Sequence, residues 1–286
     1  MFILCGTNIK KTFFINKKSR VYYNIFMHKI HVSEINSTNS LMLQTLSAGT
    51  EYEEGTVIYT LRQTAGRGQV GNSWESEADK NIAFSLLLRP EFLPIREQFY
   101  LSEITCLAIL EALEELGVKN LSVKWPNDIY ADDDKICGIL IENSLMGSKF
   151  NYSVIGVGIN VNQEKWMGNA PNPTSVKLKT AKEHDPEAVL ELVTNNLWKY
   201  YMMLHSDSPL SLSEAQELIH NLYISQLYRK DGYYPYKDTE SGKEFMAMIK
   251  TIEPSGYLLL EDTEGSQYRY MFKEVKFVLP CGVTKE

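Results

Sequence analysis

Residues 66–74 have the composition of an anion-binding loop. They read Gly-Arg-Gly-Gln-Val-Gly-Asn-Ser-Trp and lie between two strand-like runs, residues 56–61 and 81–88. Glycine has no Cβ atom, so backbone N–H groups in such a loop can approach a ligand closely and line a concave nest for an anion. Arg67 adds a planar guanidinium that suits a carboxylate or a phosphate. A glycine-rich segment between strands can also be a plain turn, so other segments must decide.

Two further segments contain a lysine with a carboxylate close by in sequence. Residues 124–128 read Lys-Trp-Pro-Asn-Asp, and residues 135–142 read Lys-Ile-Cys-Gly-Ile-Leu-Ile-Glu. A lysine ammonium can stabilise negative charge that develops on phosphate oxygens, and a carboxylate can take a proton from an attacking amine. Taken alone, Lys135 is also compatible with a solvated lysine at a hairpin, and Asp128 with a turn residue after Pro-Asn.

In combination, these segments resemble the motifs of the biotin–protein ligase family. The other matching segments are Ser-Thr-Asn at residues 37–39, Gln63, and Gly-Val-Gly-Ile-Asn-Val-Asn at residues 156–162. Any one of them is a weak signal, whereas several in the same order and at the same spacing are a strong one. The resemblance is to biotin–[acetyl-CoA-carboxylase] ligases without an N-terminal winged helix, since about 30 residues precede the motifs.

The resemblance implies a two-step reaction. Biotin and ATP form biotinyl-5′-AMP and pyrophosphate, and biotin then passes to a lysine of a biotin carboxyl carrier domain of acetyl-CoA or a related carboxylase. Both steps place negative charge on phosphate oxygens, so the site needs fixed cations and N–H donors. It also needs Mg²⁺, which we expect to arrive with ATP and not to occupy a fixed protein site. Water must be excluded from the reactive adenylate.

The resemblance also implies a role for individual residues. The catalytic group comprises Lys135, Arg67, Asp128 and Lys124. The biotin-binding group comprises Ser37, Thr38, Asn39, Gln63, Gly66, Arg67, Gly68, Lys135 and Gly138, in which neutral polar side chains suit the uncharged urea ring of biotin. The adenylate- or ATP-binding group comprises Arg67, Gly68, Gln69, Trp74, Lys124, Asn127, Lys135 and Asn160. The Ser-Thr-Asn run can also serve as a plain helix cap.

The glycine loop departs from the family pattern in its charge. Several members of the family carry further basic residues there, at the positions that hold Gln69, Val70, Asn72 and Ser73 in this chain. Arg67 is the one basic residue that the loop retains. We expect this loop to rely more on backbone amides and packing, and therefore to retain the adenylate less tightly.

The elements that must position these residues can be predicted from hydrophobic periodicity. Helices are indicated from about residue 41 and over residues 102–116, 186–205 and 211–223. Short strands at residues 121–123, 129–130, 136–141 and 152–159 predict an antiparallel meander. From about residue 226, short strands alternate with Gly-containing turns, which is typical of a small all-β module.

The fold class implied is α+β. We expect a mixed or antiparallel sheet with flanking helices, like the catalytic domain of class II aminoacyl-tRNA synthetases, followed by a small SH3-like β barrel. The predicted divisions are an N-terminal extension over residues 1–26, which is unstructured or precedes the native start, a catalytic domain over residues 27–225 and the barrel over residues 226–286.

Composition narrows the class of protein. The chain has 286 residues, 44% of them hydrophobic and 23% charged, which is ordinary for a folded protein. The net charge of −7 argues against nucleic-acid binding, and no run approaches the ~20 apolar residues of a membrane span. We therefore expect a cytoplasmic protein that does not bind membranes, a monomer or a homodimer. The four cysteines lie far apart in sequence, which predicts buried thiols, not a disulfide or a zinc site.

Three other functions fit parts of the pattern. A lipoate– or octanoate–protein ligase or transferase would share the fold class, but would need a long apolar slot and different loop motifs. A biotin-sensing repressor would need a DNA-binding domain. A non-catalytic module would bind biotin without consuming ATP.

Overall fold

The computed structural model describes residues 27–69, 71–168 and 172–279. The expected N-terminal extension, Val70, Cys5 and Cys281 lie outside these ranges. Cys106 and Cys137 are buried free thiols, as the cysteine spacing predicts. Within the described ranges, none of the helices combines the length and apolar character needed to cross a bilayer.

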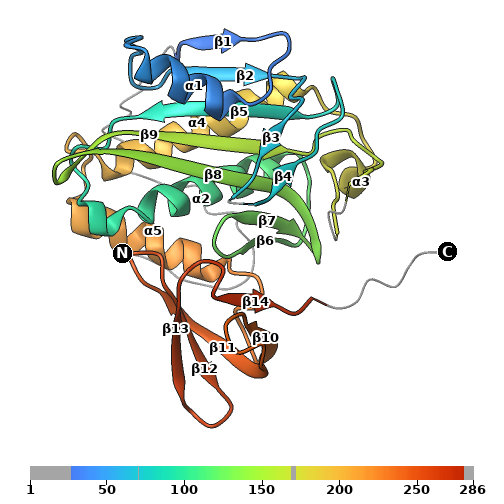
Figure 1. Ribbon diagram of the computed structural model, residues 1–286, viewed down its shortest axis with the longest axis vertical. Coiled ribbons are helices and arrows are strands. Elements are labelled where there is room, and N and C mark those ends of the chain that lie inside the picture. The colour runs from blue at the N-terminus through green and yellow to red at the C-terminus, as the bar shows by residue number, and fades with distance from the viewer. Residues whose placement is uncertain (1–26, 70, 169–171, 280–286) are drawn as a thin grey trace.

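A seven-stranded mixed sheet forms the centre of the larger part of the molecule (Figure 1). Only its first pair, β1 with β2, is parallel, and the remaining neighbours are antiparallel. This architecture confirms the expected α+β class. In spatial order the strands are β1 (Lys29–His31), β2 (Val57–Thr60), β5 (Ile82–Leu88), β9 (Lys149–Ile159), β8 (Asp134–Met146), β7 (Asp128–Ala131) and β6 (Leu121–Lys124).

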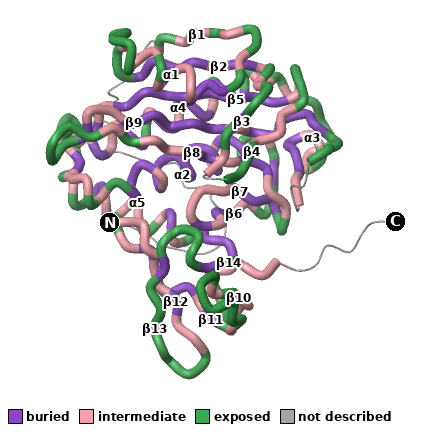
Figure 2. The backbone as a smooth tube through the Cα atoms, viewed as in Figure 1, coloured by how far each residue is buried: buried purple, intermediate pink, exposed green. Residues whose placement is uncertain are grey.

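Helices cover both faces of this sheet. Because side chains alternate along a strand, Ile58, Leu87 and Val154 pack with Met42 of α1 (Thr38–Ser47) on one face. The alternate residues join a larger core with α2 (Tyr100–Glu115), α4 (Pro186–Leu204) and α5 (Leu212–Ser225) on the other. Figure 2 shows the central strands buried between the two layers. Two short helices, η1 (Ile95–Glu97) and α3 (Val176–Thr180), complete this part.

The helix boundaries follow local signals in the sequence. The Ser37 hydroxyl caps α1 by accepting a hydrogen bond from the Ser40 N–H. Gly117 follows α2 with φ of +92°, a conformation that favours glycine. Ser211 and Glu214 form a capping box at the start of α5. The predicted helices and the antiparallel meander of β6 to β9 are therefore confirmed.

Two elements of the glycine loop were not expected. Strands β3 (Gly66–Arg67) and β4 (Ser73–Trp74) pair as a short antiparallel hairpin. In Figure 1 this hairpin lies in front of the sheet, beside β8. The loop is therefore a two-stranded flap and not a plain turn.

The C-terminal module is a five-stranded antiparallel sheet. Its order is β13 (Gln267–Tyr270), β12 (Leu258–Asp262), β11 (Glu244–Ile252), β10 (Tyr234–Asp238) and β14 (Val275–Phe277). Among the described strands, β13 and β14 form the two edges and do not pair with each other. The sheet is thus open, and closure into an SH3-like barrel stays a prediction.

Candidate functional site

A cavity of about 650 Å³ lies between the sheet, the β3–β4 hairpin and the C-terminal module. This volume is in the usual range for a small-molecule site. With two exceptions, Gly66 and Asn160, the residues expected at the site line it: Ser37, Thr38, Asn39, Gln63, Arg67, Gly68, Gln69, Trp74, Lys124, Asn127, Asp128, Lys135 and Gly138. Segments up to a hundred residues apart in sequence therefore meet in one place.

The start of α1 supplies a buried group of neutral polar side chains. The Thr38 N–H donates a hydrogen bond of 3.0 Å to Oε1 of Gln63. The hydroxyl of Ser85, on β5, lies 2.8 Å from Oγ1 of Thr38 and also contacts Oδ1 of Asn39. Ser85 was not among the expected residues, because it lies in an apolar strand with no motif around it. Such a group can recognise an uncharged polar ligand through hydrogen bonds.

Glycines on β8 and β9 leave room for this group. A Cβ atom at Gly156 would collide with the amide of Asn39, and one at Gly158 would lie 2.6 Å from the indole of Trp74. Gly138, opposite Gly158 in the strand register, would bring a Cβ atom within 3.0 Å of the same ring. The three glycines thus form a floor on which Asn39 and Trp74 lie. The Trp74 Nε1–H is buried and has no hydrogen-bond partner in the described chain.

A cluster of two lysines and one carboxylate occupies another part of the cavity. Nζ of Lys135 lies 2.6 Å from Oδ1 of Asp128, and Nζ of Lys124 lies 4.0 Å from Oδ2 of the same side chain. Burial lowers the pKa of Lys124, the nearby Asp128 opposes this effect, and Lys135 adds to it. The Lys124 ammonium also lies 5.3 Å from the centre of the Phe277 ring. These cations are suited to an anionic ligand.

The β7–β8 hairpin positions this cluster. Asp128 pairs with Gly138 in the register of the two strands. The Asn127 side chain donates a hydrogen bond of 2.6 Å to the carbonyl of Ile139, so the turn before β7 is tied to β8. The backbone of Lys135 is held from the other side, because its N–H donates to the Asn172 carbonyl at 2.7 Å.

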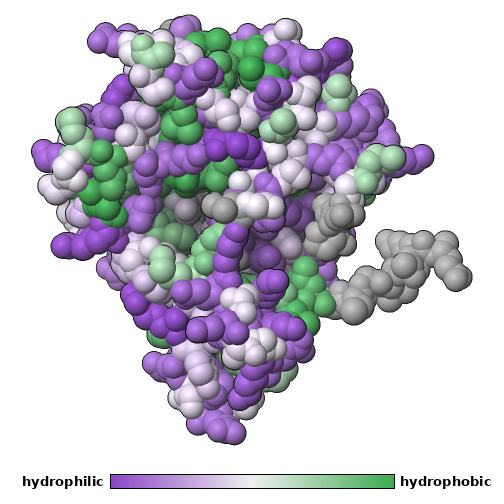
Figure 3. Space-filling model, viewed as in Figure 1, coloured by the Kyte–Doolittle hydropathy of each residue, from purple (hydrophilic) through white to green (hydrophobic). Residues whose placement is uncertain are grey.

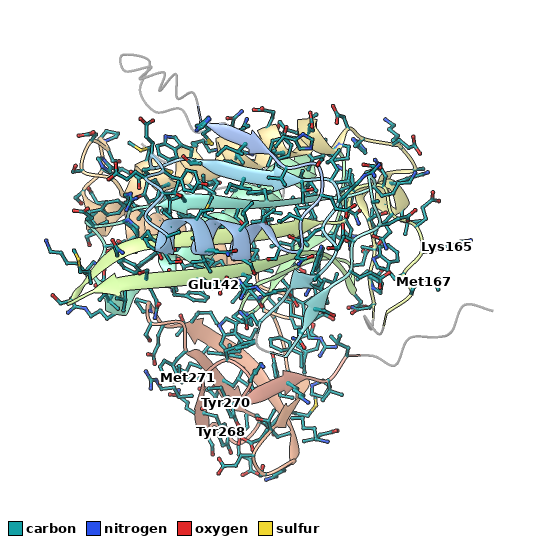
Figure 4. All side chains as sticks on the ribbon, turned by 45° about the horizontal axis from the view of Figure 1, so that its top comes forward. Glu142, Lys165, Met167, Tyr268, Tyr270 and Met271 are labelled. Atoms are coloured by element: carbon teal, nitrogen blue, oxygen red, sulfur yellow. The ribbon has the colours of Figure 1, made fainter. Side chains whose placement is uncertain are left out.

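Glu142 links the glycine loop to α1 and was not predicted. Its Oε2 atom lies 2.5 Å from Nη2 of Arg67 and accepts a hydrogen bond of 3.0 Å from Nδ2 of Asn39. Figure 4 labels Glu142 on β8, beside α1. The signal that could have revealed it is its spacing: Gly138, Leu140 and Glu142 alternate by two along β8, and so point to the same face.

Two expected residues lie away from the cavity wall. Gly66 is packed against the Trp74 backbone and the Gln63 side chain, where a Cβ atom would not fit. Asn160 follows β9, is 3% exposed, and donates a hydrogen bond of 2.9 Å to the Thr174 carbonyl. Its Oδ1 atom has no partner within the described ranges.

The C-terminal module contributes one wall of the cavity that sequence reasoning missed. The lining residues from this module are Thr239, Phe272, Lys273, Val275, Lys276 and Phe277. No motif marks them, and more than a hundred residues separate them from Lys135. In the described ranges, no group of three or more His, Cys, Asp or Glu side chains is arranged to hold a metal ion.

Comparison with known proteins agrees with this geometry. Residues 32–160 match the model of the biotin/lipoate A/B protein ligase family. The chain is 30% identical over 253 residues to the bifunctional ligase/repressor BirA of Bacillus spizizenii, and the match covers 85% of this chain and 72% of that protein. The chain belongs to the biotin–protein ligase family. A further member, BirA of Bacillus subtilis, is 29% identical over 227 residues, a match that covers 76% of this chain but only 65% of the relative.

The fold agrees with that of solved members of the family. A biotin protein ligase from Aquifex aeolicus, in complex with biotin and ATP, superposes with a TM-score of 0.70 at 25% sequence identity. The superposition covers 89% of this chain and all of the Aquifex chain.

Proposed function

We propose that this chain is a biotin–protein ligase, which attaches biotin to a lysine of a biotin carboxyl carrier domain at the expense of ATP. The observation that carries the proposal is a single cavity with neutral polar groups at the start of α1 and cations around Asp128. Biotin has an uncharged urea ring at one end and a carboxylate at the other, and so matches this polarity. The biotin and ATP bound by the Aquifex relative support the same substrates here.

In the first step, a biotin carboxylate oxygen attacks the α-phosphorus of ATP, and the bond from that phosphorus to pyrophosphate breaks. Lys135, Lys124 and Arg67 stabilise the charge on the phosphate oxygens. Asp128 holds the Lys135 ammonium in position through its contact of 2.6 Å. Flanking contacts to the adenylate come from Gly68, Gln69, Trp74 and Asn127, which line the same cavity.

In the second step, the amine of the carrier lysine attacks the biotinyl carbonyl carbon and AMP leaves. A free lysine with a pKa of about 10.4 is mostly protonated at neutral pH. Asp128 is the acidic side chain that lines the cavity, and it acts as the base that receives the proton.

Mg²⁺ fits this cavity as an ion carried by the nucleotide. Asp128 is the one acidic side chain among the described lining residues, and protein sites commonly bind Mg²⁺ through one or two carboxylates together with substrate phosphates. The phosphates would therefore provide most of its ligands, with Asp128 as the available protein carboxylate. When bound, Mg²⁺ offsets the negative charge of the triphosphate.

Biotin is favoured over lipoate by the polar end of the cavity. Thr38, Asn39 and Ser85 are buried, and the Ser85 hydroxyl contacts the other two side chains. This polar group suits a urea ring better than an apolar dithiolane. We also propose, on the family resemblance, a catalytic domain over residues 27–225 of the class II synthetase type and an SH3-like module from residue 226. A monomer and a homodimer both remain compatible with this proposal.

The test is pyrophosphate release that depends on both ATP and biotin. The wild-type protein is expected to turn over with biotin and not with lipoate. Lys135→Ala should lose activity by on the order of 10²-fold or more, because it removes a cation from the developing phosphate charge. Lys149→Ala, at the exposed start of β9, is the matched control and should keep full activity. Turnover with lipoate, or an unaffected Lys135→Ala variant, would refute the proposal.

A further inference from the structure

The carboxylate of Glu75 bonds to the backbone of a segment far away in sequence. Glu75 directly follows Trp74, the last residue of β4. Its Oε1 atom accepts a hydrogen bond of 2.8 Å from the Met167 N–H, and its Oε2 atom accepts one of 2.7 Å from the Gly168 N–H. Hydrogen bonds from backbone N–H groups to a carboxylate are shorter and stronger than those between neutral groups. The end of the β3–β4 hairpin is therefore tied to a second part of the chain.

Polar bonds, and not side-chain burial, hold the end of this second part. The Met167 side chain is 95% exposed, and Figure 4 labels it at the outer edge of the molecule, together with Lys165. On the face seen in Figure 3, hydrophilic residues predominate around α3, which follows a few residues further along the chain. A Cβ atom at residue 168 would lie 2.6 Å from Oε2 of Glu75, so the glycine allows the carboxylate to approach. The two hydrogen bonds to Glu75 therefore fix the backbone of Met167 and Gly168.

The first residues of the same segment are held by a buried amide network. Gln163 is 1% exposed, and Asn81, which precedes β5, is fully buried. Oε1 of Gln163 accepts hydrogen bonds from Nδ2 of Asn81 and from the Glu77 N–H. Nε2 of Gln163 donates one of 2.8 Å to the Lys165 carbonyl. Because buried polar groups that satisfy one another are rigid, the part of the segment that Glu75 contacts extends from a fixed base.

Glu75 is placed to hold Trp74 and does not itself reach the cavity. Trp74 lines the cavity, whereas Glu75 is not among the described lining residues. The Trp74 ring lies on the glycine floor, and its centre is 5.7 Å from Nζ of Lys135. On one side, the backbone of Trp74 is held by its pairing with Gly66. On the other side, the next residue is Glu75, so its bonds fix the backbone from which the indole extends.

We propose that Glu75 is a positioning residue for the adenylate. By binding two backbone N–H groups of the distant segment, it holds the Trp74 indole on the glycine floor and beside the ammonium of Lys135. The inference rests on the proposed function, in which Trp74 contacts the adenylate, and Glu75 acts through that ring without touching a substrate. An anchor outside the cavity suits a loop that has a single basic residue with which to hold a bound phosphate.

The experiment measures how fast the purified protein releases biotinyl-5′-AMP. Glu75→Ala removes both acceptor oxygens and should raise the release rate about tenfold. Glu75→Gln keeps one acceptor oxygen and should raise it about threefold. Glu77→Ala is the matched control and should release the adenylate at the wild-type rate. Glu77 carries the same charge at an exposed position, and its contact with Gln163 is made by a backbone N–H that alanine retains.

A double variant tests whether Glu75 acts through Trp74. In a Trp74→Ala background, Glu75→Ala should raise the release rate by less than about twofold, because the ring that it positions is already absent. A merely structural contribution of Glu75 would raise the rate by the same factor in both backgrounds. That result would overturn the inference.

Amide hydrogen exchange in the ligand-free protein separates this inference from the proposed function. Exchange reports local opening of the backbone and needs neither biotin nor ATP. In Glu75→Ala, the N–H groups of Met167, Gly168 and β4 should exchange about tenfold faster than in the wild type, whereas Glu77→Ala should match the wild type. If the wild type makes no biotinyl adenylate but Glu75→Ala shows this faster exchange, the proposed function fails and the hold of Glu75 on the hairpin stands. Unchanged exchange in β4 of Glu75→Ala would refute that hold.

Discussion

At the scale of single residues, the sequence motifs predicted which side chains line the cavity better than they predicted the contacts between those side chains and their neighbours. Lys124, Asp128 and Lys135 lie together as their motifs indicate. Glu142 was missed although it ends one of these motifs, because an acidic residue within a strand does not indicate which partner it meets. Its contacts to Arg67 and Asn39 depend on how three distant segments pack.

Glu142 has two separable contacts, so two substitutions can distinguish them. Glu142→Gln removes the ion pair with Arg67 but can still accept the hydrogen bond from Asn39, whereas Glu142→Ala removes both. The ion pair is partly exposed, since the Arg67 side chain is 42% accessible and that of Glu142 28%. Its loss should therefore cost about 0.2–1 kcal/mol. We therefore expect the KM for biotin to rise by up to about fivefold for Gln, and by tenfold or more for Ala.

Steady-state kinetics with biotin and ATP varied separately provide the measurement. The larger effect of Ala should appear in the KM for biotin, since Asn39 lies in the polar group that we assign to biotin. If the Gln and Ala variants have the same KM for biotin, the orientation of Asn39 does not depend on Glu142.

At the scale of elements, hydrophobic periodicity predicts the long helices and the meander, but not the β3–β4 hairpin, β10 and β14. Strand β10 contains Pro235, and proline within a run argues against a strand because it has no N–H to donate. Strand β14 has three residues, too few for a periodic pattern. The β3–β4 hairpin has two residues in each strand. Tertiary contacts, which periodicity does not report, determine these three elements.

One substitution can test the contact between the glycine floor of β8 and β9 and the β3–β4 hairpin that lies on it. Gly158→Ala would place a Cβ atom 2.6 Å from the Trp74 ring, so the indole must leave its position over the strands. Overpacking of this kind costs about 1–3 kcal/mol. We expect biotin affinity to fall roughly tenfold, and the midpoint of urea unfolding to fall with the free energy of unfolding.

Calorimetric titration with biotin measures the affinity, and a double variant serves as the control. If Gly158→Ala acts by displacing the indole, it should add less than about threefold to the effect of Trp74→Ala, since neighbouring residues are not additive. A full additive loss in the double variant would contradict this mechanism and would place the new methyl group against the ligand.

At the scale of the whole molecule, direct hydrogen bonds join the C-terminal module to the sheet-bearing part. The Phe99 N–H donates a hydrogen bond to the Pro254 carbonyl, and the Trp125 indole donates one of 3.1 Å to the Gly256 carbonyl. His220 of α5 lies between Glu103 of α2, at 2.8 Å, and Thr251 of β11, at 3.5 Å. Composition could indicate a separate β module, but not its docking, because docking depends on individual side chains of both parts.

The burial of Glu103 makes the stability of this junction depend on pH. Glu103 is fully buried, and one of its carboxylate oxygens has no hydrogen-bond partner in the described chain. Burial raises the pKa of Glu103 above its ordinary value of 4.5, and His220 partly opposes that shift. The folded protein therefore holds this proton more tightly than the unfolded chain does. The resulting stabilisation is complete below pH 4.5 and is lost as pH rises through the raised pKa.

Glu103→Gln cannot ionise and should remove this component of the pH dependence. Above pH 4.5, the free energy of unfolding of the wild type should fall relative to that of the variant, by at most about 1.4 kcal/mol per pH unit. Urea unfolding at a series of pH values measures the difference. Glu115→Gln is the control, because Glu115 is exposed at the end of the same helix and should leave the wild-type profile unchanged. An unchanged pH profile in Glu103→Gln would mean that Glu103 ionises in the folded protein as it does in the unfolded chain, and that its burial at the junction has no effect on proton binding.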